Sequence, residues 1–316
     1  MKTRKLGNPD IQIAPIVFGG NVFGWTIDEK KSFEVLDAFV DAGFNCIDTA
    51  DVYSRWAPGN QGGESEAIIG RWMASRKNRD RIVIATKVGM EMPDGKGLSK
   101  DRIAMAMEAS LKRLQTNYVD LYQAHADDES TSLEESLAAF EKIQKAGKAR
   151  VIGASNYKGA RLQKALETAE KAGFSGYRTF QPQYNLYDRE GFEKDQEAVC
   201  VKNDLSVITY SSLASGFLTG KYRGTADAAK SPRGEGVRNR YLNERGTRIL
   251  RALDEVSEEV RGTPAQVALA WLLHRPSVTA PIVSATNVDQ LRDIVKAVEI
   301  RLDTGHLEKL NKASAG

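Results

Sequence analysis

The sequence predicts an α/β fold of the (β/α)8 type, a TIM barrel with an N-terminal hairpin as a cap and extra helices near the C-terminus. Apolar runs of strand length alternate with amphipathic helical patterns along the chain. Polar residues follow where three consecutive runs end, as they do at the catalytic face of such a barrel. No Gly-x-Gly-x-x-Gly follows a strand, which disfavours the competing doubly wound sheet. With 316 residues, the chain is expected to form one domain over residues 1–316.

The expected elements follow the alternation in order. Residues 3–13 are expected to form a hairpin around the turn cluster at 7–10, and a first strand at 15–18 breaks at two glycines. Further strands are expected at 44–48, 82–86, 118–124, 149–154, 177–182, 205–210 and 279–284. Helices are expected at 29–42, 64–75, 99–115, 132–146, 158–172 and 191–203.

Three segments fall outside the alternation. Residues 220–246 are rich in Gly, Arg, Asn, Ser and Lys, and we expect a long mobile loop there on the catalytic face, because long loops in compact domains are usually functional. Residues 247–261 predict an extra amphipathic helix before the one that starts at Pro264. Residues 303–313 predict a short final helix.

Composition excludes several classes of protein. The net charge of +3 is small and scattered, which argues against a nucleic-acid or membrane partner. Cys46 and Cys200 show no metal-ligand spacing, and both are expected to be reduced core residues of a cytoplasmic protein. The N-terminus has no apolar signal segment, and no run is long enough to span a bilayer. We therefore expect a small-molecule substrate and no metal.

Four polar side chains are expected on the catalytic face. Asp48 ends the run 43–47 and Tyr53 follows five residues later, Lys87 ends the run 81–86, and His125 ends the run 118–124. The carboxyl ends of parallel strands meet at one face of a barrel. Singly, Tyr53 could be a loop aromatic, Lys87 a solvated lysine and His125 a surface histidine. Their joint placement after three consecutive strands favours one catalytic site.

These residue types predict an unusual proton donor. A free tyrosine has a pKa near about 10, and a neighbouring ammonium lowers it. We expect Lys87 to lower the pKa of Tyr53 by roughly two units, with Asp48 holding Lys87 charged. His125 would orient a substrate oxygen. No side chain is an obvious nucleophile, so the group that attacks the carbonyl carbon is expected to be a hydride from a cofactor.

Four segments resemble the signature of the aldo-keto reductase superfamily, in its long-chain prokaryotic-type branch related to potassium-channel β subunits. They are residues 43–53, 63–66, 85–87 and 148–156. The resemblance covers essentially the whole chain and includes every member of the catalytic tetrad, which consists of Asp48, Tyr53, Lys87 and His125. It implies an (α/β)8 barrel that binds a nicotinamide cofactor without a Rossmann motif and reduces aldehydes or ketones reversibly.

The resemblance also implies a set of cofactor-binding residues. Ser155, Asn156 and Gln181 would hold the nicotinamide carboxamide, Tyr210 would stack on the ring, and residues 211–221 would form the pyrophosphate loop. The segment from Ser284 matches the adenosine-phosphate site, with a serine where many members carry Lys or Gly, and with Ile294 where an Asn is usual. The full expected set is Gly20, Asn21, Ser155, Asn156, Gln181, Tyr210, Ser211, Leu213, Ala214, Gly216, Leu218, Lys221, Arg233, Ser284, Thr286, Gln290 and Asp293.

The substrate pocket is expected to have aromatic walls. These suit an apolar or sugar-like ring, although Trp25 and Trp56 could equally be loop anchors. The loop residues expected around the open end of the barrel are Asn21, Phe23, Trp25, Trp56 and Tyr184.

The expected function is that of an NADP-dependent oxidoreductase that reduces carbonyl compounds, with Tyr53 as the general acid. Lys221, Arg223, Arg233 and Arg292 favour NADP over NAD, whereas Asp289 or Asp293 gripping a ribose hydroxyl would favour NAD. The alternative is a cofactor-binding regulatory protein with the same fold and little turnover. The physiological substrate and the choice between monomer and homo-oligomer stay open.

Overall fold

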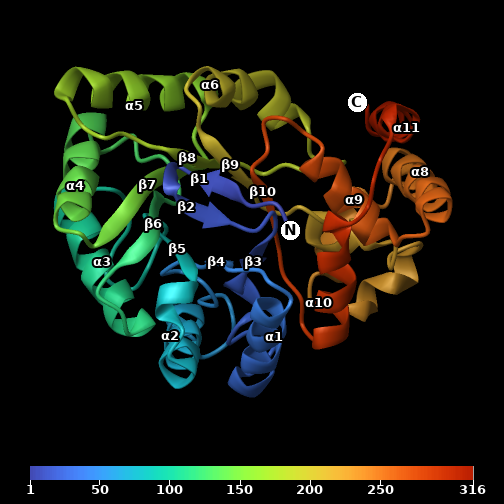
Figure 1. The fold of residues 1–316 in the computed structure, drawn as a ribbon, viewed down its shortest axis with the longest axis horizontal. Coiled ribbons are helices and arrows are strands. Elements are labelled where there is room, and N and C mark those ends of the chain that lie inside the picture. Colours follow the sequence, from blue (N-terminus) through green and yellow to red (C-terminus); the bar gives the residue numbers. More distant parts are fainter. Residues whose placement is uncertain (316) are drawn as a thin grey trace.

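The expected barrel is confirmed. The computed structural model describes residues 1–315, so Gly316, the last position of the expected 1–316 domain, lies outside the described residues. Within that range eight parallel strands close in the order β10-β3-β4-β5-β6-β7-β8-β9 (Figure 1). Their bounds are β3 (Val17–Gly19), β4 (Cys46–Asp48), β5 (Val83–Val88), β6 (Val119–Ala124), β7 (Ala149–Ser155), β8 (Thr179–Gln181), β9 (Ser206–Thr209) and β10 (Ala280–Val283).

Helices surround the barrel wall (Figure 1). Several begin where the sequence offers an N-cap, as at Ser99 and Ser132, whose side chains accept from the backbone three residues on. The α-helices before β9 are α1 (Glu29–Asp41), α2 (Glu64–Arg76), α3 (Lys100–Leu114), α4 (Leu133–Lys145), α5 (Gly159–Ala172) and α6 (Glu197–Lys202), the last continuing the π-helical turn η3 (Phe192–Gln196). Those after β9 are α7 (Gly234–Tyr241), α8 (Glu244–Val260), α9 (Pro264–Leu273), α10 (Val288–Val295) and α11 (Thr304–Ser314).

The N-terminal hairpin closes one end of the barrel. Strands β1 (Arg4–Leu6) and β2 (Asn8–Ile13) pair antiparallel, and Figure 1 shows them across the barrel centre. Leu6, Ile11 and Ile13 are buried in the same core cluster as the inward-facing barrel residues Leu121 and Val151. The hairpin therefore plugs the amino-terminal end, and the carboxyl ends of the strands form the other, open end.

The segment 220–246 differs from expectation. It is not a long unstructured loop, because it contains the 3-10 turn η5 (Thr225–Lys230) and helix α7. Tyr222, Val237 and Tyr241 are buried and anchor it. Within α7, Val237 and Tyr241 have the i, i+4 spacing of a helix, but two such residues are too few to predict one from the sequence. Helix α10 was also not expected.

Two further findings bound the chemistry of the described residues 1–315. None of their helices has the length and apolar character needed to cross a bilayer. No cluster of three or more His, Cys, Asp or Glu side chains in this range could hold a metal ion. Cys46 and Cys200 are buried and free, as the sequence predicts.

Candidate active site

The four expected catalytic side chains meet at the open end of the barrel. Asp48 is the last residue of β4, and Tyr53 lies five residues later in the loop to α2. Lys87 lies at the C-terminal end of β5, one residue before its last. His125 follows β6 directly, where its N–H donates to Val88 O at 2.8 Å. Ladder pairing of the three neighbouring strands thus brings the four residues together.

Lys87 is the centre of the hydrogen-bond network. Its ammonium donates to Asp48 Oδ2 at 2.6 Å, to Tyr53 Oη at 2.8 Å and to the carbonyl of Thr49 at 2.9 Å. The side chain is fully buried, and burial lowers its pKa while the Asp48 carboxylate opposes this. A buried ammonium is tolerated where it is paired and its protons are all hydrogen-bonded, and this one meets both conditions.

Tyr53 departs from the predicted acidity. Burial and the adjacent Asp48 carboxylate raise the pKa of its hydroxyl well above the ordinary value, whereas the sequence predicted that Lys87 would lower it. The larger cause is burial, which disfavours the charged phenolate, and the Asp48 carboxylate adds to it, since Tyr53 Oη donates to Asp48 Oδ2 at 3.2 Å. The phenol is therefore protonated at neutral pH, which is the form that can give up a proton.

His125 is held as a neutral imidazole. Burial, and then the charge of Lys87, lower its pKa well below the usual range. Its ring lies 6.0 Å from that of Tyr53, in an edge-on arrangement. Within residues 1–315, Nδ1 is buried and has no hydrogen-bond partner. A neutral ring beside the phenol can hydrogen-bond a substrate oxygen without adding charge to the site.

The residues expected around the nicotinamide carboxamide also come together. Ser155 Oγ donates to the carbonyl of Gln181 at 2.8 Å, since β7 and β8 pair at these positions. Asn156, with a left-handed φ of 56°, donates to the carbonyl of His125 at 2.9 Å and accepts from Tyr210 Oη at 2.7 Å. Gln181 Nε2 donates to Asp48 Oδ1 at 2.9 Å. Two of the residues expected to bind the cofactor's carboxamide, Asn156 and Gln181, therefore contact His125 and Asp48 of the tetrad directly.

The expected pyrophosphate loop contains a run of left-handed residues. Leu213 is near the right-handed region (φ −107°, ψ 20°), and Ala214, Ser215 and Gly216 then take positive φ. The Ala214 and Gly216 N–H groups donate within the loop, to Ser211 O at 2.7 Å and to Leu213 O at 2.9 Å. Non-glycine residues at positive φ are strained, so such a run indicates a functional loop.

Arg233 reaches back over the open end from the segment before α7. Its guanidinium lies 5.1 Å from the ring of Trp25. Burial lowers its pKa, and Nη2 is buried with no hydrogen-bond partner among the described residues. A buried guanidinium nitrogen without a partner costs free energy, which an anionic phosphate oxygen would recover. The side chain thus fits a phosphate-bearing cofactor.

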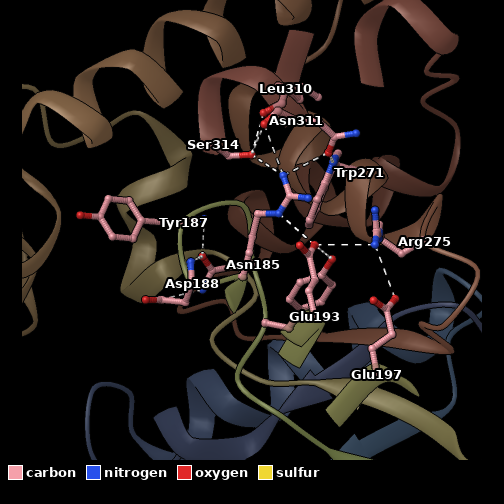
Figure 2. A network of polar contacts seen from close by, with 12 residues as sticks. Asn185, Tyr187, Asp188, Glu193, Glu197, Trp271, Arg275, Leu310, Asn311 and Ser314 are labelled. Carbon is pink, nitrogen blue, oxygen red and sulfur yellow. Dashed lines mark hydrogen bonds and ion pairs between the residues drawn. The ribbon is translucent and has the colours of Figure 1, made fainter. Parts of the chain in front are cut away.

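Helix α7 is attached to the segment after β8 through Asp188. This carboxylate accepts from Tyr241 Oη and Arg240 Nη2, both at 2.8 Å, and from Asn185 Nδ2 at 3.1 Å. Asn185 also donates to the carbonyl of Ser211 at 2.9 Å, at the start of the pyrophosphate loop. Figure 2 shows Asp188 beside Asn185, in a network that continues to Asn311 and Ser314 on α11. One carboxylate therefore joins α7 to the loop.

The residues of the expected adenosine segment point to different partners. Ser284 Oγ lies 2.7 Å from both Gly19 O and Asn21 Oδ1, and Thr286 Oγ1 donates to Gln290 Oε1 at 2.9 Å. The carboxylate of Asp293 has a different role: it accepts from Thr263 Oγ1 at 3.1 Å and from Gln266 Nε2 at 2.7 Å, at the N-terminus of α9. These contacts join α10 to the start of α9.

The expected aromatic wall is partly present. Trp25 and Trp56 pack edge to face at 5.6 Å, and Trp56 packs at 5.9 Å against Tyr53 while remaining 48% exposed. Phe23 and Tyr184 were wrongly placed there. Phe23 is fully buried and stacks on Phe18 at 5.3 Å, because the bridge between Phe23 and Ile27 folds the loop inward.

Tyr184 is likewise fully buried. It packs against Trp271 and donates from Oη to Glu193 Oε1 at 2.6 Å.

Sequence reasoning missed three residues that support the site. Gln123, inside the apolar run of β6, is fully buried and contacts Gln181. A polar residue in the middle of a buried strand was the signal that could have identified it. Thr49 acts through its carbonyl and Asp188 through contacts distant in sequence, so neither leaves a local pattern.

Comparison with known proteins agrees with this geometry. The chain matches the Aldo/keto reductase family over residues 15–315, and it belongs to that family. It is 38% identical over 327 residues to the uncharacterized oxidoreductase YrpG of Bacillus subtilis, covering 100% of this chain and 97% of that protein. It is 32% identical to a probable voltage-gated potassium channel subunit beta of Arabidopsis thaliana (95% and 92% covered). It is 29% identical to an aryl-alcohol dehydrogenase [NADP(+)] of Phanerodontia chrysosporium (95% and 82% covered).

Proposed function

We propose that this protein is an NADP-dependent reductase of aldehydes or ketones, with residues 1–316 acting as one domain in the cytoplasm. The observation that carries the proposal is the contact of a protonated Tyr53 with the ammonium of Lys87 at 2.8 Å, beside the neutral ring of His125. Free, buried thiols at Cys46 and Cys200 suit a reducing compartment.

The chain's own residues handle the proton. The bound dihydronicotinamide would supply the hydride to the carbonyl carbon. His125 donates a hydrogen bond from its ring N–H to the substrate oxygen and orients it. As negative charge develops on that oxygen, Tyr53 Oη transfers its proton there, and the new O–H bond completes the alcohol. The phenolate that remains is stabilised by Lys87, whose charge is kept in place by Asp48.

The cofactor would lie across the open end of the barrel. Ser155, Asn156 and Gln181 would hold the carboxamide, Tyr210 the ring, and the pyrophosphate loop and Arg233 the phosphates. An unpartnered guanidinium nitrogen on Arg233 supports a cofactor with an additional phosphate. The residues that we propose to contact it are Gly20, Asn21, Ser155, Asn156, Gln181, Tyr210, Ser211, Leu213, Ala214, Gly216, Leu218, Lys221, Arg233, Ser284, Thr286 and Gln290.

The aromatic wall favours planar substrates. Trp25, Trp56 and Tyr53 form a chain of edge-to-face contacts that ends at the proton donor. Offset and edge contacts between rings add to the free energy of burying an aromatic group. The similarity to an aryl-alcohol dehydrogenase supports the same class, so we propose aromatic aldehydes as the favoured substrates.

The similarity to potassium channel β subunits supports a second candidate, a cofactor-binding partner with little turnover. Steady-state assays over a panel of aromatic, aliphatic and sugar-derived carbonyls, with NADPH and NADH, separate the two. Turnover of a substrate in the panel at rates typical of enzymes, about 1–1000 per second, supports the reductase. Tight NADPH retention with no turnover would support the second candidate instead.

A further inference from the structure

The carboxylate of Asp48 is held by two different sets of donors. Oδ2 accepts from Lys87 and Tyr53, while Oδ1 accepts from Gln181 Nε2 at 2.9 Å. Strand β8, which carries Gln181, is four strands from β4 in either direction around the barrel. The glutamine therefore contacts Asp48 from the opposite side of the barrel, and both residues are buried.

A second glutamine, Gln123, accepts a hydrogen bond from Gln181. Gln123 Oε1 lies 3.4 Å from the same Gln181 Nε2, so the two amide protons of Gln181 are directed at Asp48 and Gln123. Gln123 is fully buried, and it lies in register beside Lys87 on the neighbouring strand. The carboxylate accepts only, which requires the NH2 group of Gln181 to face it. The side-chain oxygen Oε1 of Gln181 is then left as the acceptor for a carboxamide.

We propose that Gln123 and Gln181 are positioning residues that form an amide bridge holding Asp48, and that the bridge links the carboxamide subsite to the proton donor. With Oδ1 engaged, the carboxylate cannot rotate, and Oδ2 stays directed at Lys87 and Tyr53. A cofactor amide that binds Gln181 then aligns the tetrad through one side chain. The proposal rests on the reductase function proposed above, and it assigns a role to Gln123.

Two substitutions test the bridge. Gln123→Met preserves volume but removes the acceptor for Gln181. We expect kcat to fall by about fivefold or more with little change in the dissociation constant of NADPH. Gln181→Glu preserves shape but places a carboxylate against Asp48. Like charges raise one pKa of such a pair, so we expect lost activity at pH 8 that recovers as the pH falls and the new acid is protonated.

Thr179→Val is the matched control. Thr179 is fully buried, and it lies level with Gln123 in the barrel, because both residues pair in register with Gly153. Its hydroxyl has no hydrogen-bond partner among the described residues. Its substitution should leave kcat and the pH profile unchanged. Wild-type kcat in Gln123→Met, or a pH profile of Gln181→Glu that parallels the wild type, would overturn the bridge.

An activity-independent measurement separates this proposal from the proposed function. Urea unfolding midpoints of Gln181→Met, Asp48→Asn and the double variant form a double-mutant cycle. Coupled effects on the midpoint support the bridge even if the wild type reduces no carbonyl, a result that would refute only the reductase function. Additive effects, in an enzyme that does turn over, would refute only the bridge.

Discussion

At the scale of single residues, the charge state of each side chain follows from what lies against it. Tyr53 stays protonated because burial and Asp48 outweigh the nearby ammonium, and His125 stays neutral because it is buried beside Lys87. The acid is therefore strengthened during the reaction rather than before it. Once charge forms on the substrate oxygen, Lys87 can stabilise the phenolate that proton transfer leaves.

Replacing the proton donor should remove catalysis without unfolding the protein. Tyr53→Phe keeps the ring that packs on Trp56 and removes only the hydroxyl. We expect kcat/KM for carbonyl reduction to fall far more than tenfold, while NADPH binding by fluorescence titration is retained. A loss of less than tenfold, about 1.4 kcal/mol, would contradict the assignment.

Lys87 and Tyr53 should act as one unit. Lys87→Met removes the ammonium that contacts both Asp48 and Tyr53, so we expect a loss of kcat/KM comparable to that of Tyr53→Phe. The double variant should be little worse than either single variant, because residues that act together are non-additive. If the fold-loss of kcat/KM in the double variant equals the product of the two single losses, Lys87 and Tyr53 contribute separately.

A buried carboxyl behind the site should make stability depend on pH. Burial and the neighbouring Glu66 raise the pKa of Asp51 to about 7, against the opposing charges of Arg102 and Arg113. In the unfolded chain the Asp51 carboxyl has a pKa of about 4. Between these values the folded state binds more protons, so this contribution to the free energy of unfolding falls as pH rises from about 4 to 7.

The matching variant is Asp51→Asn. Urea unfolding at pH 5 and at pH 8 should show a smaller decline in stability between the two than in the wild type, because the titrating group is gone. An unchanged difference between the two pH values would show that Asp51 does not titrate in this window. Groups shared by both proteins cancel in the comparison.

At the scale of elements, hydrogen bonds to Asp188 connect α7 to the segment after β8. The carboxylate joins Arg240 and Tyr241 to Asn185, which holds the pyrophosphate loop at Ser211. On the other side of this segment, Arg189 donates to Asn311 and Ser314 and so secures α11, in the network of Figure 2. Side-chain contacts therefore link α7, the segment after β8, the expected pyrophosphate loop and α11.

Weakening the contacts of Asp188 should increase the dissociation rate of NADPH. Asp188→Asn weakens the charged contacts to Arg240 and Tyr241, so we expect faster dissociation of NADPH in stopped-flow displacement. Limited proteolysis should also cleave the segment 223–245 more readily, and NADPH should slow that cleavage. Glu190→Gln, which removes only an exposed pair with Lys194, is the control. Identical dissociation rates in Asp188→Asn and the control would argue against the role of Asp188.

At the scale of the whole molecule, the expected cofactor site spans segments from both ends of the chain. Ser284, after β10, contacts Gly19 at the end of β3 and Asn21 just after it, while Arg233 lies over Trp25. Because β10 and β3 are neighbours in the closed barrel, residues 265 apart in sequence share this edge. The barrel's closure therefore brings together the residues that we propose to bind the adenosine end of the cofactor.

NADPH should be preferred over NADH. We expect kcat/KM with NADPH to exceed that with NADH by at least tenfold, which requires about 1.4 kcal/mol of discrimination. Arg233→Met should reduce the ratio if its unpartnered nitrogen binds a phosphate of NADPH. Equal use of both cofactors in steady-state assays would refute the preference, and it would direct attention to the exposed Asp289 as a ribose ligand.

The sequence by itself predicted the strands, most helices and the four polar side chains that meet at the open end of the barrel. These depend on local information: the period of apolar residues along the chain and the polar residues that follow each strand. Phe23 shows the limit of that information, because a loop aromatic looks the same in sequence whether it faces a pocket or, as here, the core. The sparse apolar residues of 220–246 concealed α7 for a similar reason.

Only the tertiary structure decided the acidity of Tyr53, the bridge from Gln123 through Gln181 to Asp48, and the attachment of α7 to Asp188. Each depends on atoms that the tertiary fold brings within hydrogen-bond distance, from positions up to 133 residues apart in the case of Asp48 and Gln181. Burial and Coulomb interactions act through space at these short distances. The sequence therefore identified the polar groups that gather at the open end, and the tertiary structure decided which of them interact.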